Sequence, residues 1–127
     1  MNVKQRNLRA GDELVDGDVV TVRGGAFDAE VLREDALRYF SIYGRYGISV
    51  FAARKVAVDE LAQQPPLVRF EVLSLVRVSV RRTAGFRLEA TGRNPQHFTV
   101  AWDDLNEGVE RLVACEHETS LNPYHRY

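Results

Sequence analysis

The sequence predicts a single α+β domain with one mixed or antiparallel sheet of four to five strands and three to four helices, mainly on one face of the sheet. Segments with a helical spacing of apolar residues alternate along the chain with short β-branched segments. Two strand-like segments near the C-terminus are close enough to form a hairpin. The 127 residues, of which 45% are hydrophobic, suffice for one core, so we assign 1–127 to one domain.

The first half of the chain predicts a strand, a helix and a second strand. The β-branched residues 19–22 predict a strand that ends before a pair of glycines. Asp28 is suited to cap a helix, apolar residues then recur at intervals of three and four, and Gly44 is suited to follow its last turn. We therefore predict a helix over 28–43. The apolar run 47–53 predicts a buried strand.

The second half predicts shorter elements separated by prolines and glycines. A double proline ends one brief helix, a glycine closes another, and a turn cluster at 92–95 joins the two strands of the hairpin. The predicted elements are helices at 58–64 and 79–84, strands at 71–76, 86–90 and 97–102, a last helix capped by Asp103, and an irregular tail over 116–127.

Composition narrows the function classes. The formal net charge of −1 argues against nucleic-acid binding by bulk charge alone. No run approaches the roughly 18 apolar residues of a membrane span, and no apolar leader is present, so we expect a cytoplasmic protein without a membrane partner. The single cysteine excludes an internal disulfide. We expect no metal and no cofactor.

The charges are segregated along the chain. Residues 67–97 carry a net charge of +4, and residues 103–118 carry −5. A near-neutral protein with this pattern can present a basic face and an acidic face. One interpretation is a phosphate-binding face on 67–97; the other is that the two blocks neutralise each other or are solvated.

A histidine and a threonine on one predicted strand form the first candidate site. Strand alternation places His97 and Thr99 on the same face, where an imidazole can transfer a proton and a hydroxyl can bond a phosphate oxygen. We therefore predict catalytic roles for both. Arg23, Arg87 and Arg93 are predicted to bind substrate beside them. The alternative is a polar pair on the exposed face of a hairpin.

The run His97-Phe98-Thr99-Val100 resembles one half of the motif pair of 2H phosphoesterases. That family needs two such motifs, which face each other across a cleft. The best counterpart here, Gly47-Ile48-Ser49-Val50, has Gly47 where a histidine belongs. We predict that Ser49 binds substrate phosphate and, because its strand is apolar, that it is buried or nearly so.

Arg23-Gly24-Gly25, followed after a helix by the strand with Ser49, resembles the first two landmarks of arginine-type ADP-ribosyltransferases. The resemblance implies that Arg23 contacts a dinucleotide. The third landmark of that family is a Glu-x-Glu strand. Glu116-His117-Glu118 has the matching letters but belongs to the predicted irregular tail. The alternative is a strand end followed by a flexible turn.

Cys115, with His117 and His125, supplies three residue types that bind zinc, although the spacing is not a recognised one. Cys115 shares a helix face with Leu112, so we expect it to be mostly buried and to carry no metal.

Tyrosines and arginines are interleaved between residues 38 and 46. Such a pattern can stack nucleic-acid bases. However, Tyr39 and Tyr43 fall on the apolar face of the predicted helix, so we expect them to pack in the core.

Six segments of the chain, taken together, resemble a family of short, uncharacterised actinobacterial proteins. These segments are Val22-Arg23-Gly24-Gly25, Tyr46 to Phe51, Asp59-Glu60-Leu61, Gly85-Phe86, His97 to Val100 and Asn122-Pro123. Short prokaryotic proteins of this kind are often one half of a two-gene toxin–antitoxin module. The resemblance itself brings no established activity, and from the class of protein we hypothesise a toxin component that acts on RNA or a nucleotide through a phosphate-binding cleft. The alternatives are a non-catalytic module that binds a cognate small protein or forms a homodimer, and a small ADP-ribosyltransferase-like enzyme. Whether the protein is an enzyme stays open at this point.

Overall fold

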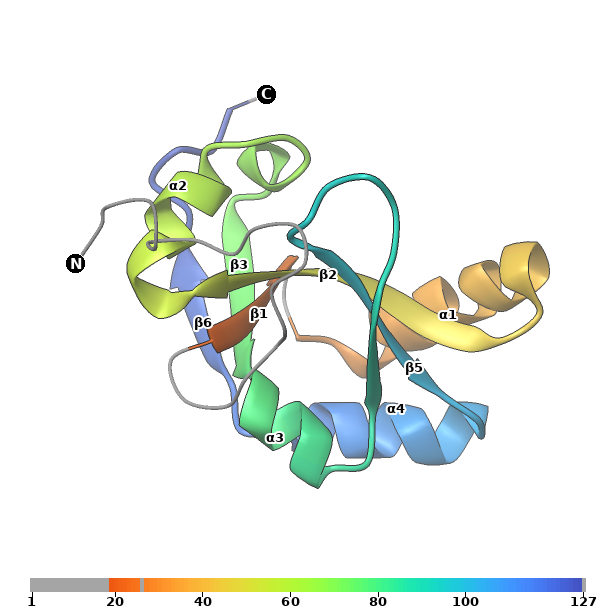
Figure 1. The fold of residues 1–127 in the computed structure, drawn as a ribbon. Coiled ribbons are helices and arrows are strands. Elements are labelled where there is room, and N and C mark those ends of the chain that lie inside the picture. Colours follow the sequence, from red (N-terminus) through yellow and green to blue (C-terminus); the bar gives the residue numbers. More distant parts are fainter. Residues whose placement is uncertain (1–18, 26, 127) are drawn as a thin grey trace.

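The computed structural model describes residues 19–25 and 27–126, which form one antiparallel sheet and four α-helices (Figure 1). The sheet has six strands in the order β4-β5-β2-β1-β3-β6. Its strands are β1 (Val19–Gly24), β2 (Tyr46–Arg54), β3 (Val72–Arg77), β4 (Arg87–Ala90), β5 (His97–Trp102) and β6 (Glu118–Leu121). The α+β class is confirmed, and the sheet has one strand more than the upper number predicted.

The helices cover the two faces of the sheet unequally. They are α1 (Ala29–Tyr43), α2 (Val58–Ala62), α3 (Val78–Thr83) and α4 (Leu105–Ala114), with short 3₁₀ turns at Lys55–Ala57 and Leu67–Arg69. Residues of α1, α3 and α4 share one core cluster with the sheet, whereas α2 and the second 3₁₀ turn build a smaller cluster on the other face. Figure 1 shows α2 across the sheet from α3 and α4. No helix among the described residues is long and apolar enough to cross a membrane.

Helix ends follow the side chains that cap them. The carboxylate of Asp28 accepts hydrogen bonds from the backbone N–H groups of Glu30 and Val31 at the start of α1, and Gly44 ends the helix with φ 74°. Both predicted caps are confirmed. For α4 the cap is Asp104, which accepts a bond from the Glu107 N–H, so the prediction of Asp103 is wrong by one residue.

The C-terminal segment differs from the prediction. Within the range 116–127, which we expected to be irregular, residues Glu118–Leu121 form β6 and pair with β3 at one edge of the sheet. All four residues of β6 are exposed, so the strand has no apolar side to reveal it in the sequence. Its existence depends on the partner strand, not on its own residues.

The pairing of β2 creates the place where a site can form. Residues 46–51 pair with β5 on one edge of β2, and residues 51–54 pair with β1 on the other edge. Among the described pairs, Phe51 is therefore the one residue of β2 with a strand partner on both sides. The first half of β2, which does not pair with β1, has strand β5 on one edge and packs against α1.

Candidate functional site

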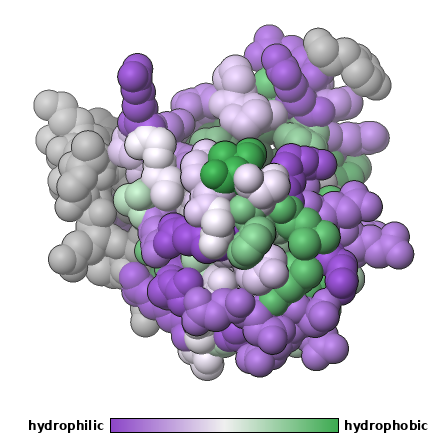
Figure 2. All heavy atoms as spheres, turned by 90° about the vertical axis from the view of Figure 1, so that its right-hand side faces the viewer, coloured by the Kyte–Doolittle hydropathy of each residue, from purple (hydrophilic) through white to green (hydrophobic). Residues whose placement is uncertain are grey.

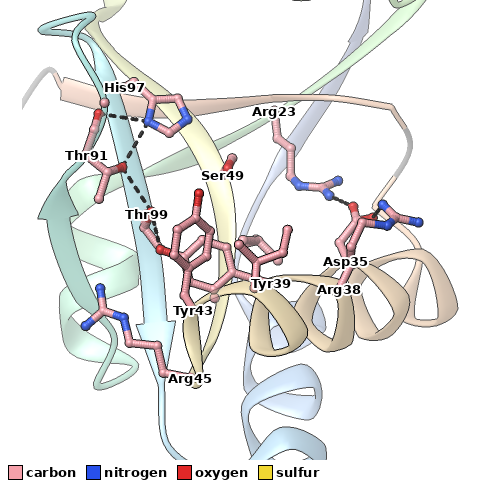
Figure 3. Close-up of a pocket in the computed structure, with 14 residues that line it drawn as sticks. Arg23, Asp35, Arg38, Tyr39, Tyr43, Arg45, Ser49, Thr91, His97 and Thr99 are labelled. Atoms are coloured by element: carbon pink, nitrogen blue, oxygen red, sulfur yellow. Dashed lines mark hydrogen bonds and ion pairs between the residues drawn. The ribbon is translucent and has the colours of Figure 1, made fainter.

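A cavity of about 780 Å³ opens beside the first half of β2 (Figure 3). Its walls come from the end of β1, the last two turns of α1, the start of β2, the loop between β4 and β5, and β5 itself. Four of the six predicted site residues border it: Arg23, Ser49, His97 and Thr99. In Figure 3, Ser49 lies between His97 on one side and Arg23 on the other. Residues far apart in the sequence are thus brought to one pocket.

The other two predicted residues do not line this pocket. Arg87 makes ion pairs with Asp103 at 3.2 Å and with Glu89 at 4.0 Å, on the outer strand of the hairpin. Arg93 lies exposed in the turn after β4. The strand register pairs Arg87 with Ala101 and not with His97, and neither arginine lines the pocket, so the substrate-binding role predicted for both stays a prediction.

The imidazole of His97 has a defined orientation. Its Nδ1 lies 3.0 Å from the backbone oxygen of Thr91 and 2.9 Å from the Thr91 hydroxyl. A carbonyl oxygen can only accept, so this contact favours the tautomer in which Nδ1 carries the proton and donates it. In Figure 3 the second ring nitrogen, Nε2, points away from Thr91. In the neutral ring, Nε2 then holds the free lone pair that a general base needs.

Thr99 is held within a group of hydroxyls instead of facing the cavity freely. Its side chain is buried, at 1% exposure, and its Oγ1 lies 3.0 Å from the Thr91 hydroxyl and 3.2 Å from the Tyr39 hydroxyl. The predicted shared face of His97 and Thr99 is correct, since Phe98 and the alternate residues after it lie in the core on the opposite face. However, α1 covers Thr99 through Tyr39, which the strand pattern does not reveal.

Ser49 is exposed, so the prediction that it is buried is wrong. Its strand is nevertheless central in the sheet, with β5 and β1 as neighbours. The exposure arises because Ser49 lies on the stretch of β2 that does not pair with β1, where the pocket opens. Its hydroxyl is therefore available to a ligand on the pocket floor.

The wall opposite His97 carries two arginines that share one carboxylate. Arg23 forms an ion pair with Asp35, and Arg38 lies 3.1 Å from the other oxygen of the same carboxylate. Burial lowers the pKa of Arg23, and its Nε has no hydrogen-bond partner among the described residues. An arginine that is largely buried, with an unused donor, is suited to bind an anion.

A third arginine closes the lower end of the pocket. Arg45 forms a bidentate ion pair with Glu89, and its interactions with Glu89 and, secondly, with Tyr39 raise the pKa of Arg45. Among the described lining residues, three arginines face one carboxylate, Asp35. Even with Glu89 counted against Arg45, one positive charge remains unmatched, which favours an anionic ligand.

The pocket has an aromatic rim. The rings of Tyr39 and Tyr43 lie 4.5 Å apart between centroids, and Tyr43 is 63% exposed. The expectation that both tyrosines pack in the core is thus wrong for Tyr43 and only partly correct for Tyr39, which is half-buried. Ile42, 65% exposed, lies next to them on the rim. Figure 2 views the side of the molecule that carries α1 and shows apolar side chains gathered at its centre, surrounded by hydrophilic ones.

Several pocket residues were not assigned to a site from the sequence. They are Asp35, Arg38, Tyr39, Tyr43, Arg45 and Thr91. The interleaved tyrosines and arginines at 38–46 were the one available signal, and it was outweighed by the helical apolar pattern. The basic block 67–97 contributes no arginine to the described lining, because its arginines point to other surfaces or into the core.

The remaining candidates lie elsewhere. Glu116 and Glu118 border a separate small cavity beside β3, so no Glu-x-Glu pair reaches the pocket with Arg23 and Ser49. Cys115 is buried, as predicted, at 6% exposure. Within the described residues, no group of three or more histidine, cysteine or acidic side chains could hold a metal.

No family model, curated protein or solved structure matches this chain.

Proposed function

We propose that the pocket binds the phosphate group of a nucleotide or of RNA and that His97 moves a proton at that phosphate. One observation carries the proposal: a histidine with a free Nε2 and arginines in excess of carboxylates border the same cavity. Either feature by itself is common in proteins. Together in one pocket they are the groups that phosphoester chemistry needs.

The phosphate is placed at the wall formed by Arg23 and Arg38. Because these two guanidinium groups share the single carboxylate of Asp35, one of their positive charges is unmatched. Planar guanidinium groups bind phosphate oxygens through paired N–H bonds. The exposed hydroxyl of Ser49, between this wall and His97, supplies a further donor.

The aromatic rim accounts for the nucleoside part. Tyr43 is exposed beside Tyr39 and within the same pocket as the arginines. A base stacked on a tyrosine gains about 1–3 kcal/mol, and the gain tolerates any base. A ligand that combines a planar base with a phosphate would therefore use both ends of the cavity.

The chemistry follows from the orientation of the imidazole. Nε2 of His97 accepts the proton of an attacking hydroxyl or water, whose oxygen forms the new bond to phosphorus. The bond from phosphorus to the leaving oxygen breaks, and solvent water protonates that oxygen. The arginines stabilise the negative charge that builds on the phosphoryl oxygens. Because one histidine borders the described pocket, this scheme differs from that of the two-motif 2H phosphoesterases.

The other proposals are supported less. An ADP-ribosyltransferase-like activity lacks its glutamate pair in the described part of the pocket. A role as the toxin of a two-gene module stays a prediction, since it concerns a partner protein and not the geometry of this chain. A non-catalytic binding module would share the pocket but not need the free Nε2.

Binding and turnover separate these proposals. We would titrate the protein with the common ribonucleoside monophosphates and a short single-stranded RNA by calorimetry, and follow RNA integrity by gel electrophoresis. Arg38→Ala should weaken binding about tenfold, whereas Arg93→Ala, in the exposed turn outside the pocket, should leave it unchanged. His97→Ala should retain binding and lose turnover. Binding that survives Arg38→Ala, or turnover that survives His97→Ala, contradicts the proposal.

A further inference from the structure

A chain of hydrogen bonds connects the pocket histidine to the opposite end of the cavity. The Nδ1 of His97 contacts the Thr91 hydroxyl at 2.9 Å, and that hydroxyl contacts Thr99 at 3.0 Å. Thr99 contacts the Tyr39 hydroxyl at 3.2 Å. Figure 3 shows the part of this chain that runs from His97 through Thr91 to Thr99. Three hydroxyls, from the loop after β4, from β5 and from α1, thus form one chain that begins at His97.

The backbone oxygen of Thr91 sets the direction of the hydrogen bonds near His97. It can only accept, so in the Nδ1-protonated ring His97 Nδ1 donates to it, and the Thr91 hydroxyl accepts from Nδ1 as well. The hydroxyl proton of Thr91 is then directed to Thr99 Oγ1.

The backbone holds Thr91 in this position. Its N–H donates to the His97 backbone oxygen at 3.2 Å, so the two residues are joined through both main chain and side chain. The next residue is Gly92, with φ 74°, a conformation that residues other than glycine adopt at a cost. The turn therefore returns the Thr91 carbonyl and hydroxyl to the ring of His97.

Glycine at position 47 allows the far part of the chain to close. A Cβ atom there would lie 2.7 Å from Thr99 Cγ2 and 3.2 Å from the Tyr39 ring. Without that atom, Tyr39 can cross over β2 and reach the Thr99 hydroxyl. The position where a second 2H-type histidine would be expected is thus occupied by the contact that buries Thr99.

We infer that Thr91 is a positioning residue that keeps His97 in the Nδ1-protonated form with Nε2 toward the cavity, and that Thr99 and Tyr39 hold Thr91 in place. The catalytic consequence rests on the proposed function, whereas the state of the ring does not. Thr99 accordingly acts through Thr91 and is not the phosphate ligand that its sequence position suggested. A free imidazole in water favours a proton on the other nitrogen, so the protein has to supply this preference.

The ring nitrogens report the tautomer directly by ¹⁵N NMR, without any ligand. We would assign the His97 signals with a His97→Gln variant and compare wild type, Thr91→Val and Thr91→Ser. Wild type should be mainly Nδ1-protonated in the neutral form. Thr91→Val keeps the shape and the backbone carbonyl but loses the hydroxyl, so the tautomer ratio should fall about fivefold, and Thr91→Ser should restore it. Thr119→Val, on exposed β6, is the control and should leave the ratio unchanged.

The result is independent of whether a nucleotide binds. A wild-type ring protonated on Nε2, or a ratio that Thr91→Val does not change, overturns the inference even if the pocket binds nucleotides. The expected tautomer pattern together with no nucleotide binding supports the inference and contradicts the proposed function. If turnover is measurable, Thr91→Val should lower kcat and leave KM nearly unchanged, and Thr91→Ser should recover kcat. A change confined to KM would assign Thr91 to ligand binding instead.

Discussion

Arg23 and Arg38 bind the same carboxylate, that of Asp35, on one wall of the pocket. The two guanidinium groups therefore lie close together and carry two positive charges, whereas the carboxylate that they share supplies one negative charge. Burial lowers the pKa of Arg23, which shows that its cation is held in an environment that solvates it poorly. An incoming phosphate would supply the missing charge.

Asp35→Asn tests this charge balance. Removing the carboxylate should tighten phosphate binding about fivefold, because the arginines lose the anion that competes with the ligand. The same change should lower the free energy of unfolding, since Arg23 loses its partner. Calorimetric titration with a nucleoside monophosphate and chemical denaturation measure the two effects. Glu34→Gln, on the exposed side of α1, is the control for charge; weaker binding by Asp35→Asn would show that Asp35 orients the arginines.

Gly108→Ala should destabilise the protein although it replaces a helical glycine. Such a change in an open helix stabilises by about 0.5–1 kcal/mol, but here the new Cβ would lie 2.0 Å from Cδ1 of Trp102. Displacing the buried indole should cost about 1–3 kcal/mol. Thermal unfolding and Trp102 fluorescence measure the effect. The matched helix variant Glu110→Ala, on the exposed face of α4, should unfold like wild type; a stabilised Gly108→Ala would show that the indole moves without cost.

Arg81 is a cation in the core, with 1% of its surface exposed. Its Nε donates to Thr21 Oγ1 at 3.3 Å, and within the described part of the chain its Nη1 has no hydrogen-bond partner. Burial lowers its pKa to about 10. The folded state therefore disfavours the charged form. That cost is complete below about pH 10 and declines as the pH rises from there toward the ordinary pKa of an arginine side chain.

Arg81→Met should consequently raise the free energy of unfolding by about 1–3 kcal/mol at neutral pH, and the gain should shrink above pH 10. Urea denaturation of both proteins across this pH range measures the difference. Arg77→Met replaces the exposed arginine at the end of β3 and should show no such pH-dependent gain in the free energy of unfolding. A variant less stable than wild type at neutral pH would mean that the bonds of Arg81 outweigh its desolvation.

Cys115 should be unreactive in the folded protein. Its thiol is buried, donates to the Arg111 backbone oxygen at 3.3 Å, and has its pKa raised by burial. At neutral pH it should react with an aromatic disulfide reagent more than about tenfold more slowly than the urea-unfolded chain. Absorbance of the released thiolate measures the rate, with Cys115→Ser as the blank. Equal rates in the two states would mean that the end of α4 opens readily.

Local patterns predicted the elements well where a helix or strand has an apolar side. The helix over 28–43 and the strand over 97–102 agree with α1 and β5 to within one residue at each end. The four exposed residues of β6 carry no such pattern, and their pairing depends on β3. The candidate site could likewise be predicted only in part, because some of its contacts join residues that lie far apart in the chain. Alternation along β5 placed His97 beside Thr99, but only tertiary structure brings Tyr39 over Thr99, 60 residues away in the chain.

Because β2 pairs with β1 along one part and with β5 along another, this strand sets the distance between the two walls of the pocket. At Phe51, Val22 of β1 lies on one side and His97 of β5 on the other, so the main chains of the two pocket walls are about 10 Å apart, or two strand spacings. No other described strand joins β1 to β5. A one-residue insertion in β2 before Phe51 would turn Ser49 to the opposite face of the sheet and shift the two walls against each other. The size of ligand that fits can therefore change without replacement of any residue that touches it.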